Sequence, residues 1–572
     1  MRPARRRLSA RYCCVLLVAC LSGGCGVQAM AEPSLVLFDG RVFTADPARP
    51  EAQAIAIEGE RIVAVGDDAT ILALAGSTTR RIDLGGRRVI PGLNDAHAHL
   101  SIEPADEVVA DPGSPDPDWT GLSAALRRAE AGAARGAWLM ATFGTTLFAD
   151  RAVDRTALDR LWPDHPVLLG SFDGHAAILN SAALRRLGIG EDIADPAGGR
   201  FERDAGGRLN GVVREYALGQ VAGRLADLTS DADALAGLRH QIEAGARWGL
   251  TTIQDMPACG SVARQARLLA QMPSPIRIRL TRMNCTTPTG PDFDQNRDVG
   301  PHPSRLVSVN GTKWLLDGVT FEGTLTPRGT GLAQTAAARG PGSPHDLAAL
   351  PALFPPAVVE AMLRDGLRRD EQLQFHVYGT PAAAELLDAM ARTGGAAVWR
   401  GRRLRMEHGD GLTPALLRRA RAMGVVLSQQ GTHLDIGAID RGLLPGLLVR
   451  MRAARAEPLR SALTAGMPLA LGSDGPLNPW LSIAGAVSDA NRPDEAISRT
   501  QALLAYTAGS AFAEFTEGDR GRLIAGRLAD LTVLDRDVLV VPVSALPDTH
   551  ALLTVVGGAI VWDAHALPTS GR

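Results

Sequence analysis

Lysine is almost absent from this sequence, because Lys313 is the one lysine among 60 Lys and Arg residues. Aromatic residues make up only 4% of the 572 residues, so stacking platforms for single-stranded nucleic acid are not expected. The formal net charge of −2 and the lack of a basic stripe also argue against nucleic acid as a partner. The expected partner is a small-molecule substrate, and both a monomer and a homo-oligomer stay open.

The single lysine indicates a position at which arginine could not replace lysine in its chemistry. Arginine keeps its proton in proteins and is a poor nucleophile, whereas a buried lysine amine can lose its proton. A neutral amine can add CO2 and become a carboxylate that bridges two metal ions. We therefore interpret Lys313 as a carboxylated metal ligand, which requires further ligands around it.

Cysteine is scarce as well, and four of the six cysteines lie within the first 25 residues. The other two, Cys259 and Cys285, have no cysteine or histidine at zinc-finger spacing, so they do not resemble metal ligands. A disulfide between them in an oxidising compartment and two buried free thiols both stay open.

The first 31 residues have the pattern of an export signal. Five arginines precede the apolar run Cys13–Leu21, which is too short to span a bilayer, and Ala29-Met30-Ala31 offers a small-x-small cleavage site. Arg5-Arg6 is compatible with twin-arginine export, and Leu17–Cys20 resembles a lipoprotein cleavage box. We predict that residues 1–31 direct export to the periplasm or medium. Both export routes, a lipid anchor and an uncleaved anchor helix stay open.

Short strands are predicted at both ends of the mature chain. In residues 32–90, Asp39-Gly40 and Gly59-Glu60 are turn signals, each between two strand-like runs that we expect to form a hairpin. Residues 516–572 return to β character and are expected to pair with residues 32–90 in one small discontinuous domain. The tail strands are predicted at Leu531–Leu534 and Thr554–Trp562.

Residues 91–515 alternate strand-like runs with longer Ala-, Leu- and Arg-rich helical runs, which predicts repeated βα units. The eight strand candidates are Leu93–His97, Thr251–Asp255, Ile276–Leu280, Lys313–Asp317, Leu373–Val377, Leu404–Glu407, Val425–Ser428 and Pro468–Ser473. Eight strands are the number needed to close a (β/α)8 TIM barrel, so we predict an α/β fold. Residues from about 101 to 240, including the strand-like Pro166–Ser171, are interpreted as an insertion after the first strand.

Polar residues at the ends of these strands predict a metal site. His97 and His99 are two residues apart on one strand and face the same side. His376, His408 and Asp474 each follow an apolar run, at the strand ends where barrel enzymes carry their chemistry. Four imidazoles and oxygen donors without a thiolate favour zinc, with iron, manganese or nickel left open. Carboxylated Lys313 would bridge two such ions.

This metal site predicts a hydrolytic mechanism. A water between two cations gives hydroxide near neutral pH, and the metals polarise a carbonyl oxygen. Asp474 is expected to bind one metal, to take the proton as hydroxide attacks and to pass it to the leaving amine.

The chain resembles the metal-dependent amidohydrolase superfamily, and more narrowly amidohydrolase family 3, the branch with N-substituted formamide deformylases. The motifs that carry the resemblance are Val89–His99, Asp173-Gly174-His175 with Asn180-Ser181, Gly211–Glu215, Gly249–Thr252, Lys313–Gly318, Phe375-His376, Glu407-His408, Leu471–Asp474 and Gly526–Leu531. The resemblance implies a (β/α)8 barrel with a composite β-sandwich. It also implies His97 and His99 on the first metal, Lys313 as the carboxylated bridge, and His376 and His408 on the second metal.

The resemblance also implies substrate-binding residues. Asp173, His175 and Glu215 fall in the family's insertion and are expected to line the substrate pocket. A structural role in the loop stays open for Asp173 and His175, as does a role for Glu215 as an additional metal carboxylate. His433, beyond the seventh strand, is a candidate substrate contact or a structural residue. Phe321–Pro344 is interpreted as a variable substrate loop.

The expected function is an exported, metal-dependent amidohydrolase that cleaves a non-peptide C–N bond. The substrate would be an amide, an N-acyl or N-formyl amine, or a cyclic amide. An ester, lactone or phosphotriester stays open, because the fold and metal set the nucleophile and not the leaving group. A surface lipoprotein that binds a metal or ligand without turnover is the alternative of another class.

Overall fold

The computed structural model describes residues 32–570 apart from two long segments, 320–346 and 434–456, and short gaps. The short gaps are 115, 145–146, 148–151, 258, 261, 348–349, 351 and 489–491. The predicted export signal at 1–31 and the predicted substrate loop Phe321–Pro344 lie outside the described residues and stay predictions. Within the described ranges, no helix combines the length and apolar character needed to cross a membrane.

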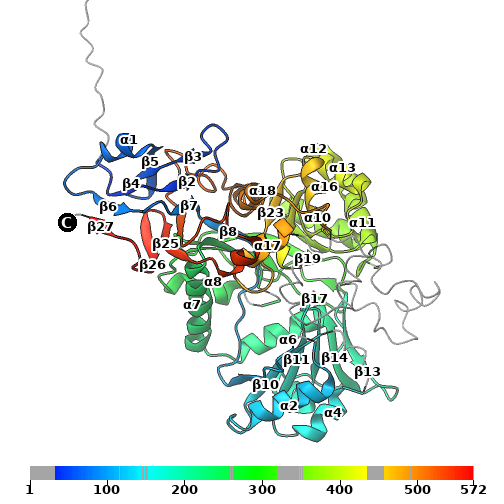
Figure 1. Ribbon diagram of the computed structural model, residues 1–572. Helices are drawn as coiled ribbons and strands as arrows, with labels where there is room; N and C mark the ends of the chain where they lie inside the picture. The colour runs from blue at the N-terminus through cyan, green and yellow to red at the C-terminus, as the bar shows by residue number, and fades with distance from the viewer. Residues whose placement is uncertain are drawn as a thin grey trace, which may run out of the picture.

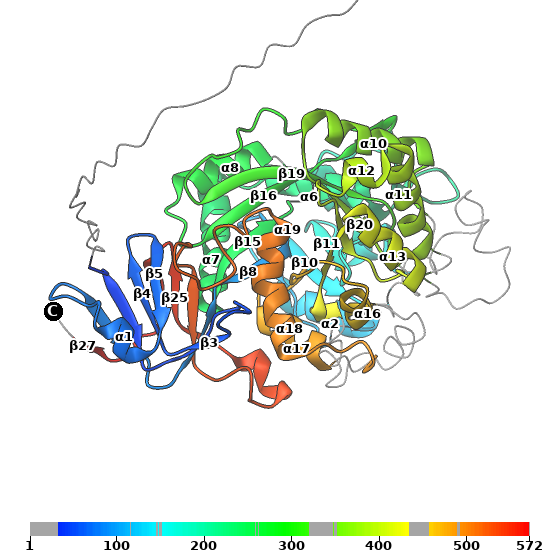
Figure 2. The ribbon, with the colours of Figure 1, turned by 90° about the horizontal axis from the view of Figure 1, so that it is seen from above.

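The centre of the fold is a ring of eight parallel strands (Figures 1 and 2). In hydrogen-bonded order they are β8 Leu93–Ala98, β15 Leu250–Asp255, β16 Arg277–Met283, β19 Val307–Leu315, β20 Leu373–Val377, β21 Arg405–His408, β22 Val426–Gln429 and β23 Leu469–Leu471. The ring is nearly closed, since Ser473 N donates to His97 O at 3.2 Å. The predicted α/β fold with an eight-stranded parallel barrel is therefore confirmed, although β19 begins well before the predicted start at Lys313.

Helices follow the barrel strands, and most of them contribute buried apolar residues to the core cluster that surrounds these strands. They are α7 Asp231–Arg247, α8 Val262–Gln271, α10 Pro356–Arg369, α11 Thr380–Arg392, α12 Gly395–Trp399, α13 Pro414–Met423, α16 Leu459–Thr464, α17 Pro479–Ser488, α18 Arg499–Leu504 and α19 Ser510–Ala513. In α13, Thr413 Oγ1 accepts from Leu416 N, and Pro414 takes the first helical position. Gly424 ends α13 at a φ of 74°, where a Cβ would lie 2.6 Å from Arg400 Cα.

The inside of the barrel contains a charged hydrogen-bond network where aliphatic side chains are usual. The fully buried Arg405 donates to Glu407 at 2.8 and 2.9 Å and to Gln254 Oε1 at 2.5 Å. Arg279 donates to the same Gln254 oxygen at 3.3 Å. We call these four residues, Arg279, Gln254, Arg405 and Glu407, the axial network.

The segment between β8 and β15 forms a separate six-stranded sheet, the cyan lobe at the bottom of Figure 1. Its strands, in order, are β13 Gly199–Arg203, β14 Leu209–Glu215, β12 Ala176–Leu179, β11 Val167–Ser171, β10 Trp138–Phe143 and β9 Glu107–Val109. Its helices are α2 Trp119–Glu130, α4 Arg155–Leu161, α5 Ser181–Arg186 and α6 Tyr216–Asp227. Buried clusters of its own lie on this sheet. The predicted insertion limit near residue 240 falls inside α7, a helix that contacts β15 and α8.

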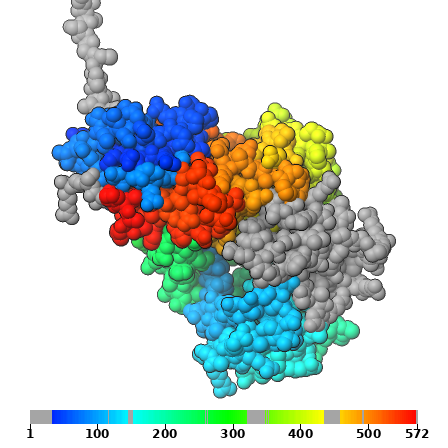
Figure 3. Space-filling view, in the orientation of Figure 1, coloured from blue at the N-terminus to red at the C-terminus, as the bar shows by residue number. Residues whose placement is uncertain are grey.

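Two further sheets combine the two ends of the chain, and Figure 3 shows their blue and red atoms side by side. One has the order β27 Thr569–Ser570, β6 Arg80–Asp83, β1 Leu35–Phe38, β4 Ala54–Glu58 and β5 Arg61–Gly66. The other has the order β26 Ala559–Asp563, β25 Ala551–Val556, β24 Leu531–Leu534, β7 Arg88–Pro91, β2 Arg41–Phe43 and β3 Glu51–Ala52. One buried cluster takes residues from both sheets, and the short helix α1 (Asp68–Leu72) contacts β1, β4 and β5. Their assignment as a β-sandwich domain of residues 32–90 and 516–572 stays a prediction.

Two strand predictions in these sheets are wrong in detail. The hairpin expected across Asp39-Gly40 does not form, because β1 pairs with β4 and β6 whereas β2 pairs with β3 and β7 of the other sheet. Gly40 packs closely there, since a Cβ would lie 2.5 Å from Leu84 Cδ1. The single strand expected at Thr554–Trp562 is the hairpin of β25 and β26, which turns at two glycines of positive φ. The hairpin at Gly59-Glu60 is confirmed by the pairing of β4 with β5.

A disulfide links Cys259, just after β15, to Cys285, just after β16. Of the two states that the sequence leaves open, the structure therefore has the bonded one. The disulfide lies beyond the carboxyl ends of two neighbouring barrel strands.

Candidate active site

The six predicted metal ligands gather at the carboxyl ends of the barrel strands. They are His97 in β8, His99 just after it, Lys313 in β19, His376 in β20, His408 at the end of β21 and Asp474 after β23. Lys313 Nζ lies 2.8 Å from His97 Nε2, and the ring centroids of His376 and His408 are 4.4 Å apart. Parallel strands bring their carboxyl ends to one rim, which is why residues distant in sequence meet here.

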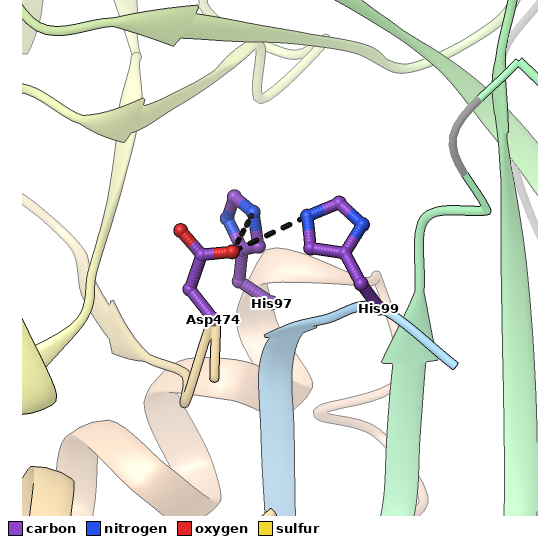
Figure 4. A group of neighbouring side chains, drawn as sticks. All are labelled: His97, His99 and Asp474. Atoms are coloured by element: carbon purple, nitrogen blue, oxygen red, sulfur yellow. Dashed lines mark ion pairs between the residues drawn. The ribbon is translucent and has the colours of Figure 1, made fainter. Parts of the chain in front are cut away.

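Asp474 is shared by two groups of candidate ligands. The first contains His97 and His99, whose Nε2 atoms lie 3.5 and 3.2 Å from Asp474 Oδ1 (Figure 4). The second contains His408 and His433, whose Nε2 atoms lie 3.9 and 3.6 Å from Asp474 Oδ2. Within each group the donor atoms lie within 4.8 Å of one another.

His376 belongs to neither three-residue group but adjoins the second. The residue is buried, and among the described residues its Nε2 has no hydrogen-bond partner. His408 Nδ1 is likewise buried without such a partner. A buried imidazole nitrogen that lacks a partner is costly, and an additional ligand at this rim would satisfy it.

The local backbone is strained at two of these residues. His408 has a φ of 69° and Asp474 a φ of 47°, a left-handed conformation that residues other than glycine seldom adopt. Asp474 N donates to His97 O at 2.9 Å, so the strained turn is tied to the first histidine strand. Strain of this kind concentrates at functional sites.

Burial lowers the pKa of several nitrogen donors of the site. It lowers the pKa of His376 and His408 well below the usual value, lowers that of His97 to about 4 with a contribution from Lys313, and lowers that of Lys313. Burial alone would raise the pKa of Asp474, but His97 and His99 hold it well below its usual range. Neutral imidazoles around one carboxylate form a donor set that fits a divalent cation.

Two residues that the sequence did not single out hold His97 in place. Glu407 Oε2 lies 2.8 Å from His97 Nδ1, and Arg405 binds the same carboxylate. Burial would raise the pKa of Glu407, but Arg405 and His97 lower it to about 2. The anionic Glu407 accepts from Nδ1–H, which leaves the His97 Nε2 lone pair directed at the site.

The predicted substrate residues of the insertion reach the same rim. His175 Nδ1 lies 2.8 Å from Glu215 Oε2, and the His175 ring centroid is 4.9 Å from that of His376. Asp173 Oδ1 accepts from Ser171 Oγ and from His175 N, which is the loop role that the sequence left open. The contact of these residues with a substrate stays a prediction.

A neighbouring acid was also missed by the sequence reading. Asp317 accepts hydrogen bonds from Tyr378 N and Gly379 N, and its Oδ1 lies 3.6 Å from His376 Nε2. It thereby fixes the turn after β20 beside the site. Its position two residues after β19 was the signal that could have identified it.

Comparison with known proteins identifies the family. Residues 80–562 match the sequence profile of the amidohydrolase family. The chain belongs to the amidohydrolase family. This confirms the resemblance found in the sequence and makes the protein a metal-dependent hydrolase of C–N bonds other than peptide bonds.

Relatives of this amidohydrolase extend over nearly its whole length. It is 28% identical to Protein LONG AFTER FAR-RED 3 of Arabidopsis thaliana, over 92% of this chain and 91% of that protein. It is 25% identical to the N-substituted formamide deformylase of Arthrobacter pascens, over 92% of this chain and 98% of that enzyme. The fold is similar to that of an uncharacterized metal-dependent hydrolase from Pyrococcus horikoshii OT3, with a TM-score of 0.62 and 19% identity, over 89% of this chain and 99% of that one.

Proposed function

We propose that this amidohydrolase cleaves an N-acyl or N-formyl amine, or a cyclic amide, with Asp474 as the proton carrier. The observation that carries the proposal is the position of Asp474 between two groups of imidazole donors. The similarity to a deformylase of N-substituted formamides supports this substrate class. Water supplies oxygen to the carbonyl carbon, the C–N bond breaks, and an acid and an amine are released.

The residues present fit a pair of divalent metals, for which we propose zinc. His97, His99 and Asp474 would hold one ion, and His376, His408 and Asp474 the other, with His433 as a further donor. Lys313 is buried and next to His97, and burial lowers the pKa of its amine, so a carboxylated Lys313 would be a further oxygen donor to these ions. When bound, the metals polarise the carbonyl oxygen and lower the pKa of water.

Asp474 is the residue that moves the proton. Its carboxylate can accept a proton from water and then give it to the leaving nitrogen. Its side chain retains some exposure at 17%, whereas that of His97 has none, so a substrate can reach it.

Elemental analysis of the purified protein tests the metal proposal. We expect about two metals per chain in wild type and a sharp decrease in Lys313→Arg prepared with bicarbonate, since arginine cannot be carboxylated. Arg267→Lys is the control, because this exposed arginine pairs with Asp231 far from the ligands. An unchanged metal content in Lys313→Arg would remove Lys313 from the ligand set.

A substrate panel then tests the reaction. Formamides, N-acyl amines and cyclic amides are compared with esters, lactones and phosphotriesters under the same metal loading. Preference for the amide group supports the proposal, whereas preference for esters or phosphotriesters contradicts it. Retained metal without turnover of any compound would favour a binding protein.

A further inference from the structure

A cavity of about 500 Å³ lies at the amino end of the barrel, away from the candidate active site. Its walls include Arg277 and Arg279 from the first half of β16, and Val307 to Asn310 from the first half of β19. The candidate metal ligands lie at the opposite, carboxyl ends of the strands. The two sites are therefore on opposite sides of one barrel, and the amidohydrolase reaction does not account for the second.

Five arginines line this cavity, and four of them have a carboxylate partner. The four pairs are Arg277 with Asp530 at 2.8 Å, Arg282 with Glu371 at 3.1 Å, Arg305 with Glu60 at 2.5 Å and Arg520 with Glu514 at 3.2 Å. The fifth arginine, Arg279, makes no ion pair with a carboxylate in the described part of the chain.

Arg279 is nonetheless among the most buried of these side chains, with 2% of its surface exposed. Its guanidinium donates only to amide and backbone oxygens, namely Gln254 Oε1, Gln372 Oε1 and Asn310 O. Its Nε has no hydrogen-bond partner among the described residues. A buried charge without a paired carboxylate is unfavourable, so the positive charge of Arg279 is poorly balanced at this wall.

The carboxylates that line the cavity are already engaged. Glu514 Oε1 accepts from Asn94 and Thr516 at 2.8 Å each, in addition to Arg520. Glu371 accepts from Arg297 at 2.7 Å and from Thr312 at 2.8 Å, in addition to Arg282. These acids therefore pair with other donors, and Glu514 raises the pKa of Arg279 only from a distance, against the larger lowering by burial.

We propose that this cavity binds a small oxyanion, a phosphate or a carboxylate, through Arg279. A guanidinium donates charge-assisted hydrogen bonds to such an anion, one Nη1–H of Arg279 is not used by the three bonds above, and the anion would supply negative charge. The cavity volume is sufficient for a small organic acid or phosphate ester as well as for the inorganic ion. Both sources share the same recognition chemistry.

Isothermal titration calorimetry of the metal-loaded protein with inorganic phosphate tests the proposal, at constant ionic strength set with sodium chloride. We expect saturable binding that weakens about tenfold or more in Arg279→Gln, because a charge-assisted hydrogen bond is lost. Arg267→Gln loses the same charge at an exposed site and is expected to bind as wild type does. Equal phosphate affinity in wild type and Arg279→Gln would place the anion elsewhere, for example at the metals, and would overturn the proposal.

A second variant keeps the test decisive if Arg279→Gln does not fold. Asp519 lines the cavity from an exposed position and pairs with Arg61, so Asp519→Asn is expected to fold and to make the cavity more positive. Phosphate affinity should then increase about twofold, a modest effect for a solvent-screened charge. No increase would contradict the proposal. Titration with malonate in the same proteins distinguishes a carboxylate ligand from a phosphate ligand.

Discussion

The two ends of the barrel suit ligands of opposite charge. At the carboxyl end, neutral imidazoles surround the ionised Asp474, which suits a cation. At the amino end, Arg279 retains a positive charge among amide oxygens, which suits an anion. Both rims belong to the same eight strands, so the residues at the strand ends, and not the fold, decide what each rim binds.

The axial network connects the two ends of the barrel through a chain of hydrogen bonds. Gln254 Oε1 accepts from Arg279 on one side and from Arg405 on the other, and Arg405 holds Glu407 against His97. Burial makes these bonds strong and their loss costly. Substitutions at either end can therefore test whether the two ends of the barrel function separately.

The largest effect is expected from Asp474→Asn. The amide cannot carry the proton and adds no negative charge to either ligand group, so kcat should fall about 10²–10⁴-fold. Steady-state kinetics on a formamide substrate measure this fall. Asp519→Asn makes the same exchange at the amino end and should leave kcat unchanged. A similar loss in both variants would show that the two ends are not separate.

An intermediate effect is expected from Glu407→Gln. The neutral amide no longer fixes His97 by charge, so metal affinity should weaken about 10–100-fold, as measured by competition with a chelator. Glu371→Gln removes a carboxylate from the amino end and is the matched control. Unchanged metal affinity in Glu407→Gln would mean that Arg405 and Glu407 only support the barrel.

An effect on folding stability, and not on metal binding or turnover, is expected from pH on the metal-free protein. The pKa of His97 is about 4 in the fold, below its ordinary 6.5, so protonation favours the unfolded chain. Its contribution is complete above pH 6.5 and is lost as pH falls toward 4, at most about 3 kcal/mol. Thermal unfolding of wild type and His97→Asn between pH 7 and 4 isolates this contribution. Buried acids such as Asp317, whose pKa is raised to about 7, act in both proteins and cancel. If the unfolding temperatures of wild type and His97→Asn changed in parallel with pH, the assignment of this pH dependence to His97 would be wrong.

The sequence predicted the rim of the candidate site well, because its signal is local. A polar residue directly after a buried apolar run, as at His376 and His408, marks a strand end, and parallel strands place all such ends together. The same reasoning identified Asp474, whereas Lys313 was identified as the single lysine of the chain. His376, His408 and Asp474 could each be recognised from their immediate neighbours in the chain.

The supporting contacts could not be predicted in this way, because they cross from strand to strand. Glu407 and Arg405 lie within a strand whose apolar pattern they interrupt, and their partners Gln254 and His97 are far away in the sequence. The prediction of a hairpin at Asp39-Gly40 was wrong for the same reason. A local turn signal cannot show that the next strand pairs within another sheet.

The pairing of β7 with β24 has a consequence for the order in which the protein is made. β7 is synthesised early, yet its antiparallel neighbour β24 emerges only after the whole barrel has been translated. Until then, one edge of β7 exposes unpaired backbone groups, which are prone to pair with other chains. The C-terminal segment therefore completes the sheet that contains β7. A chain that stops short of Leu531 would leave that edge of β7 unpaired.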